Sequence, residues 1–98
     1  MTRLRFDHSD FELDVARGAH IIDVTDQHPR ADVRYSCRSA NCGTCRVHVL
    51  EGADAFPPPE EDERGVLDLY DAPPDVRLCC QLRIVSDVPR IVLRAVDD

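Results

Sequence analysis

The spacing of the cysteines limits this chain more than any other feature. Three of them, Cys37, Cys42 and Cys45, follow the pattern C-x4-C-x2-C, and the pair Cys79 and Cys80 follows after a long gap. Iron prefers soft thiolate ligands, and a cluster of two irons needs two thiolates on each metal. Three closely spaced cysteines and one distant partner supply that number. The spacing therefore predicts a chain that folds around an iron–sulfur cluster.

The same cysteines fit two other kinds of site. Cys42 and Cys45 have the C-x-x-C spacing of a dithiol redox pair, but such a pair needs a helix that starts at its first cysteine. Here Cys37 precedes the pair, and a strand pattern follows it. Four thiolates also satisfy tetrahedral zinc, although structural zinc sites more often combine two C-x2-C pairs. A structural zinc or redox-sensing protein is therefore an alternative.

The cysteine pattern and its surroundings resemble the plant-type [2Fe-2S] ferredoxins. Gly18, a strand at residues 47–50 followed by Gly52, and the sequence Arg-Leu-Cys-Cys-Gln at residues 77–81 extend this resemblance over most of the chain. The resemblance implies one domain, residues 1–98, with an α+β fold of the β-grasp type. In that fold a helix packs across a mixed sheet, and a second short helix lies in the long excursion before the fourth ligand.

The resemblance also implies the site residues. In this family the fourth ligand directly precedes a glutamine and follows a small residue, so Cys80 is the expected ligand beside Cys37, Cys42 and Cys45. Cys79 is then a small apolar residue under the cluster, or alternatively a rescue ligand or redox-sensitive thiol. Backbone N–H groups of the loop are expected to point at the cluster sulfurs and to tune its potential. These loop residues are Arg38, Ser39, Ala40, Asn41, Gly43 and Thr44.

Charge and hydropathy indicate where the protein works. The chain has 19 acidic residues against 12 basic ones and a formal net charge of −7, so nucleic acid and anionic membranes would repel it. No apolar run approaches the ~20 residues of a membrane span, and the N-terminus has no hydrophobic signal region. We therefore expect a cytoplasmic protein that is monomeric and binds partners with basic faces.

Apolar periodicity predicts the elements of the fold. Helices are expected at residues 19–27, ended by Pro29, and at residues 60–70, ended by the sequence Asp-Ala-Pro-Pro. Strands are expected at residues 4–6, 11–15, 47–50, 82–85 and 91–93, with Phe6, Phe11, Leu13 and Val15 pointing inward. We expect His8, His20 and His28 to be solvated and His48 to lie on a strand surface.

The excursion between the third and fourth ligands carries an unusual charge. Seven carboxylates and one arginine, Arg64, lie between residues 60 and 75. Acidic side chains in the first turn are favoured by the helix dipole, so a solvated helix face is one interpretation. The other is a docking surface for basic partners, by analogy with related ferredoxins that serve oxygenases. The docking residues expected on that basis are Glu60, Glu61, Asp62, Glu63, Asp68 and Asp71.

A cluster whose coordination positions are all filled by protein has no open site for substrate. The resemblance therefore implies an electron carrier and not an enzyme. The expected route runs from a flavin-containing ferredoxin reductase to a cytochrome P450 or another oxygenase. The alternative within the same chemistry is an electron-transfer subunit of a larger oxidoreductase.

Overall fold

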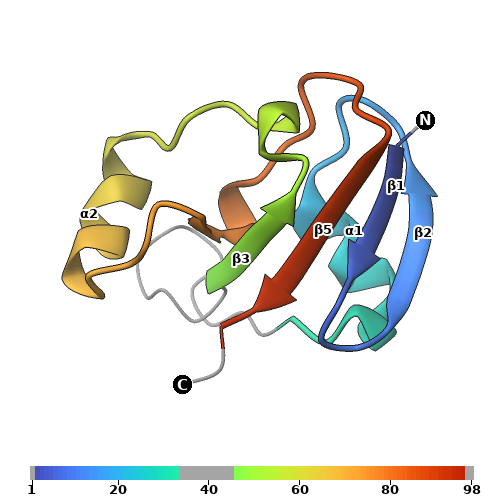
Figure 1. Cartoon of the computed structure of the whole chain (residues 1–98), viewed down its shortest axis with the longest axis horizontal. Helices are drawn as coiled ribbons and strands as arrows, with labels where there is room; N and C mark the ends of the chain where they lie inside the picture. The colour runs from blue at the N-terminus through green and yellow to red at the C-terminus, as the bar shows by residue number, and fades with distance from the viewer. Residues whose placement is uncertain (1, 34–45, 97–98) are drawn as a thin grey trace.

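A computed structural model describes residues 2–33 and 46–96 of the chain. In this part of the chain, five strands form one mixed sheet in the order β2-β1-β5-β3-β4 (Figure 1). β1 and β5 run parallel, and the other neighbouring strands run antiparallel. The strands are β1 (Thr2–Phe6), β2 (Phe11–Val15), β3 (Arg46–Glu51), β4 (Val76–Leu78) and β5 (Arg90–Ala95).

Two helices complete the fold and give it the expected α+β class. α1 (Ile21–Gln27) packs across the sheet, and α2 (Glu61–Leu69) lies beyond the edge formed by β3 and β4 (Figure 1). Within the described ranges, neither helix has the length and apolar character needed to cross a bilayer. Short 3-10 turns join these elements at Pro29–Ala31, Ala53–Ala55 and Cys79–Gln81.

The N-terminal hairpin forms as its alternating pattern predicts. β1 pairs with β2 from Thr2 opposite Val15 to Phe6 opposite Phe11. Phe6 and Val15 are buried in the core, whereas Phe11 and Leu13 are partly buried and pack against it. The inward face expected from the sequence is therefore confirmed.

Packing holds α1 in place. The helix has no side-chain cap at its N-terminus, and its β-branched residues lower its intrinsic propensity. Ile21 is fully buried, and the helix contacts the turn Cys79–Gln81. The helix begins two residues later than predicted. The Ala19 carbonyl accepts a hydrogen bond from the Ile84 N–H at 2.9 Å and so pairs with another segment and not with the helix.

The prediction of a strand at residues 82–85 is wrong. Only one isolated bridge, His20 opposite Arg83, forms in this segment. Its other backbone groups bond to different elements: the Ile21 N–H donates to the Leu82 carbonyl, and the Val85 N–H donates to the Ala55 carbonyl. The alternating apolar residues are buried as the pattern indicates, but the segment lies against α1 and a 3-10 turn and not in the sheet.

The sheet gains a strand that the sequence analysis missed. β4 is only three residues long, and it buries Val76 and Leu78 on either side of Arg77. A run of this length is too short to show a period. The second helix, α2, is within one residue of its prediction at each end.

His8 differs from the solvated side chain that we expected. Its Nδ1 accepts the Ala95 N–H at 2.9 Å, and its Nε2 lies 3.0 Å from the Asp32 carbonyl. A carbonyl can only accept, so Nε2 is the donor in this contact. His8 thereby links the β1–β2 turn to β5 through Ala95 and to the segment after α1 through Asp32.

Candidate metal centre and docking surface

The turn that contains Cys79 and Cys80 lies at the end of the strand pair β3–β4 where β3 begins. β3 begins at Arg46, the residue that follows Cys45, and Arg46 lies opposite Leu78, the last residue of β4. The turn that contains Cys79 and Cys80 follows Leu78 directly. Antiparallel pairing thus brings segments that are far apart in the sequence to the same end of the sheet.

Cys37, Cys42, Cys45 and the loop residues predicted to surround the cluster lie outside the described residues. These loop residues are Arg38, Ser39, Ala40, Asn41, Gly43 and Thr44. Within residues 2–33 and 46–96, no three His, Cys, Asp or Glu side chains are arranged to hold a metal ion.

The neighbouring cysteines at the end of β4 have different environments. Cys79 is fully buried and belongs to the hydrophobic core. Cys80 is partly exposed, and the Gln81 side-chain amide lies 3.5 Å from its Sγ, with Nε2 as the donor. A thiolate ligand accepts hydrogen bonds of this kind, which tune a metal site. The environment of Cys80 therefore fits an iron–sulfur cluster, whereas that of Cys79 fits core packing.

The carboxylate of Glu63 joins α2 to the strand that leads to Cys80. Arg77 donates to it through Nε at 2.8 Å and through Nη2 at 3.0 Å, and the Leu78 N–H donates to Oε2 at 3.0 Å. The remaining Arg77 nitrogen, Nη1, donates to the Pro57 carbonyl at 2.9 Å. One buried carboxylate thus binds a neighbouring side chain and the backbone two residues before Cys80.

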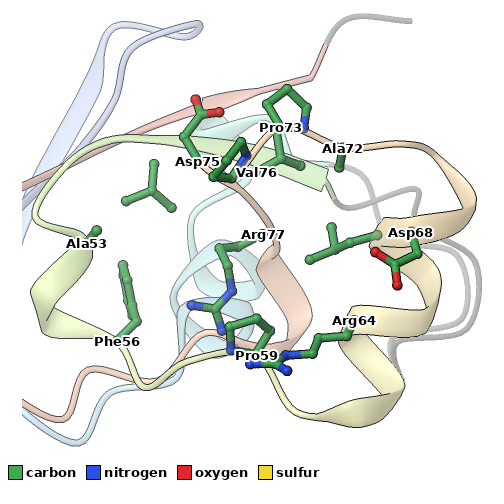
Figure 2. Close-up of a pocket in the computed structure, with 13 residues that line it drawn as sticks. Ala53, Phe56, Pro59, Arg64, Asp68, Ala72, Pro73, Asp75, Val76 and Arg77 are labelled. Carbon is green, nitrogen blue, oxygen red and sulfur yellow. The ribbon is translucent and has the colours of Figure 1, made fainter.

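This carboxylate is the main attachment of α2. The helix buries only Glu63 and Val66. A cavity of about 450 Å³ lies between α2, β4 and the segment that begins at Ala53 (Figure 2). Arg64 and Asp68 line it from the helix, and Arg77 lines it from the strand. The helix is therefore held by few buried residues, and the hydrogen bonds of Glu63 are among its main contacts with the sheet.

The role expected for Glu63 in docking is wrong. Its side chain is buried, with 2% of the residue exposed, and both of its oxygens accept hydrogen bonds. In the sequence, the three-residue helical spacing from Val66 is the only indication that position 63 faces inward and its acidic neighbours do not. The other acidic residues expected to dock are exposed; they are Glu60, Glu61, Asp62, Asp68 and Asp71.

These five residues, the acidic face of α2, differ from the paired acids of the strands and the hairpin. Within the described part of the chain they take part in no ion pair. The strands show the opposite: Arg3 pairs with Asp14, and Arg90 pairs with Glu51. Five carboxylates without an ion-pair partner therefore lie on and beside α2, although Asp23, Asp54 and Asp87 in other described segments are unpaired too.

Arg5 shows how charge is balanced on the hairpin. Its Nη2 donates to Asp10 at 2.7 Å, and Asp7 and Glu12 lie within 4.0 Å of the guanidinium. The hydrogen bond to Asp10 raises the pKa of the Arg5 guanidinium above its ordinary value, and the nearby carboxylates act in the same direction. Three carboxylates thus share one cation on this face, and such exposed pairs contribute little to stability.

One further contact connects the end of α2 to the start of β3. The guanidinium carbon of Arg46 lies 3.9 Å from the centre of the Tyr70 ring, in the geometry of a cation–π contact. Tyr70 caps the C-terminus of α2. His48 on the same strand contacts Asp75, with Nδ1 2.9 Å from a carboxylate oxygen, and is a strand-surface histidine as predicted.

The mixed sheet with its two helices, together with the cysteine spacing of the sequence, is that of a small iron–sulfur protein. A family model described as "2Fe-2S iron-sulfur cluster binding domain" matches residues 4–85. The chain therefore belongs to the [2Fe-2S] ferredoxin family, binds a [2Fe-2S] cluster and carries electrons.

Individual relatives agree with this assignment. Putidaredoxin from Pseudomonas putida is 36% identical over 90 residues, which cover 88% of this chain and 84% of putidaredoxin. One chain of a covalent complex of putidaredoxin reductase with putidaredoxin is 29% identical to this chain, with a TM-score of 0.78. The match covers 99% of this chain and 100% of that chain. An ISC-like [2Fe-2S] ferredoxin from Pseudomonas putida JCM 20004 matches this chain with a TM-score of 0.83, over 100% of this chain and 98% of the ferredoxin. At 19% sequence identity, this match shows only that the two proteins share a fold.

The Glu63 contacts predict a large loss of stability when the carboxylate is neutralised. Glu63→Gln should lower the free energy of unfolding by about 3 kcal/mol, because the charge of Arg77 stays buried without its partner. The unfolding midpoint, measured by circular dichroism together with visible absorbance, should fall by about 10 °C or more.

The matched control is Glu61→Gln, two residues away and exposed. It should change stability by no more than about 0.5 kcal/mol. Equal midpoints for the two variants would contradict the structural role of Glu63.

Proposed function

We propose that this ferredoxin is a cytoplasmic, monomeric carrier that takes electrons from a flavin-containing reductase and delivers them to a cytochrome P450 or another oxygenase. It has one domain and catalyses no reaction itself. The observation that carries the proposal is the unpaired acidic face of α2, attached through Glu63 to the strand that leads to Cys80. The complex formed by putidaredoxin with its reductase supports a reductase as donor.

The ligands that we propose for the cluster are Cys37, Cys42, Cys45 and Cys80. When bound, the cluster accepts and releases one electron. Gln81 donates a hydrogen bond toward the sulfur of Cys80, which stabilises a thiolate there. The loop residues Arg38–Asn41, Gly43 and Thr44 are proposed to donate backbone N–H groups, which would set the potential through hydrogen bonding and access of solvent.

The subfamily assignment combines two features. The C-x4-C-x2-C loop has the plant-type spacing. The 34 residues between Cys45 and Cys80, with the ending Arg-Leu-Cys-Cys-Gln, are closer to the ferredoxins that serve hydroxylases. The similarity to putidaredoxin supports the second feature, and we therefore place the chain outside the photosynthetic branch.

The surroundings of the two adjacent cysteines predict opposite results of their replacement. Cys80→Ala should destroy the cluster or make it unstable, because one iron loses a thiolate. Cys79→Ala should keep the visible spectrum and cost about 1 kcal/mol of stability, since it removes only a buried sulfur. Iron content and the visible spectrum measure both results. Loss of the cluster in Cys79→Ala with retention in Cys80→Ala would transfer the ligand to Cys79.

Docking on the acidic face of α2 predicts a salt-dependent reaction with the reductase. Asp62→Lys combined with Asp68→Lys should slow reduction by putidaredoxin reductase about tenfold at low ionic strength, because the two charges no longer steer a basic partner. The difference from the wild type should shrink as salt screens charges over about 10 Å. Stopped-flow absorbance of the cluster, recorded at several ionic strengths, measures these rates.

The control for net charge is Asp54→Lys combined with Asp87→Lys, which changes the same number of charges away from α2. Both residues are exposed. This variant should react within about twofold of the wild type. Equal slowing of the two double variants would show that net charge alone matters and would contradict docking on the acidic face of α2.

A further inference from the structure

Exposed apolar side chains gather at the C-terminal end of α2. In the described part of the chain, the large hydrophobic residues with more than a third of their surface exposed are Leu50, Leu69, Tyr70 and Val85. Leu69 is 83% exposed, more than any of the others, and Tyr70 beside it is 46% exposed. An isolated exposed leucine is ordinary, but two adjacent apolar residues at a helix end form a patch.

In this patch, Leu69 and Tyr70, only Tyr70 contacts a neighbouring element, through the Arg46 guanidinium of β3, and Leu69 takes no part in the packing of α2. The helix contacts the core through Glu63 and Val66, and Leu67 is partly buried against it. Leu69 therefore extends away from the contacts that hold the helix. Truncating its side chain should leave the fold intact, and the fold does not explain a leucine at this position.

Acidic residues flank the patch on both sides in the sequence. Asp68 and Asp71 are its sequence neighbours, and the rest of the acidic face of α2 continues toward the helix N-terminus. An apolar centre with a charged rim is the usual arrangement of a protein interface. The two parts have different effects, because charged rims raise the association rate, whereas a desolvated apolar centre slows dissociation.

The contact between Tyr70 and Arg46 fixes where the patch lies. Arg46 holds the ring at 3.9 Å and lies opposite Leu78, two residues before Cys80. Arg46 also follows Cys45 in the sequence. The patch is therefore beside the strand ends from which two of the proposed ligands extend, where a bound redox partner would be near the cluster.

We propose that Leu69 and Tyr70 are the apolar centre of the docking surface and bind a redox protein whose face has an apolar recess ringed by arginine or lysine. This inference rests on the proposed function and adds to it the contact that holds the partner after electrostatic steering. Charge complementarity selects this occupant. A second copy of the chain would bring five unpaired carboxylates against five others, and an anionic membrane would be repelled in the same way.

Two cobalt complexes of equal charge test the patch without a cognate partner. Tris(phenanthroline)cobalt(III) presents an apolar aromatic surface, and hexaamminecobalt(III) presents only N–H groups. Each takes one electron from the reduced protein and becomes cobalt(II). Leu69→Ser should lower the rate constant for the phenanthroline complex about fivefold and leave that for the hexaammine complex unchanged, because only the first complex uses the apolar centre.

Leu50→Ser is the matched control, since Leu50 is 50% exposed on β3 and lies outside the patch. It should change neither rate. Equal effects of the two serine variants, or no effect of Leu69→Ser, would overturn the inference. A wild-type dimer in sedimentation that Leu69→Ser converts to a monomer would also overturn it, because the patch would then be a contact between copies.

Failure of the inference can be told apart from failure of the proposed function. The double variant Asp62→Lys and Asp68→Lys should slow both cobalt complexes, because both carry positive charge. If it does so while Leu69→Ser has no effect, the acidic face acts in docking and only the apolar centre is wrong. If neither variant changes either rate, the docking surface itself is wrong.

Discussion

The buried carboxylate of Glu63 is the interaction on which the arrangement of this molecule depends. It binds the Arg77 guanidinium with two oxygens and also accepts the Leu78 N–H. A buried ion pair stabilises little when compared with apolar packing, but its geometry allows few alternatives. In this protein it fixes α2, which has few apolar contacts, against the strand that ends beside Cys80. The surface proposed for docking and the proposed fourth ligand are therefore held in one position relative to each other.

The ion pairs make the distribution of charge over the surface uneven. Arginines of the hairpin and of β5 are balanced by carboxylates on the same face, as in the pairs of Arg3 with Asp14 and of Arg90 with Glu51. The exposed acids of α2 have no such partners in the described ranges. A net charge of −7 would be a weak steering field if it were spread evenly, but the five unpaired carboxylates on and beside α2 give part of it a direction. The net charge alone does not reveal this distribution.

Much of the fold could be predicted from the sequence, and the exceptions have physical reasons. The hairpin and α2 have clear periods and clear ends, so their bounds agree with the predictions to within two residues. β4 is too short to show a period, and residues 82–85 have a strand pattern but bond to α1 and to a 3-10 turn. The roles of Glu63 and His8 depend on partners far away in the sequence, Arg77 and Ala95. Long-range polar contacts of this kind leave no local pattern.

This chain carries single electrons on a [2Fe-2S] cluster. A potentiometric titration of the purified protein, followed by electron paramagnetic resonance and accompanied by iron, sulfide and zinc analysis, tests it most directly. We predict about two irons and two sulfides per chain, a one-electron titration and a spin-half signal in the reduced protein. Zinc without sulfide in protein made under iron-replete conditions, or a two-electron thiol titration, would contradict the account.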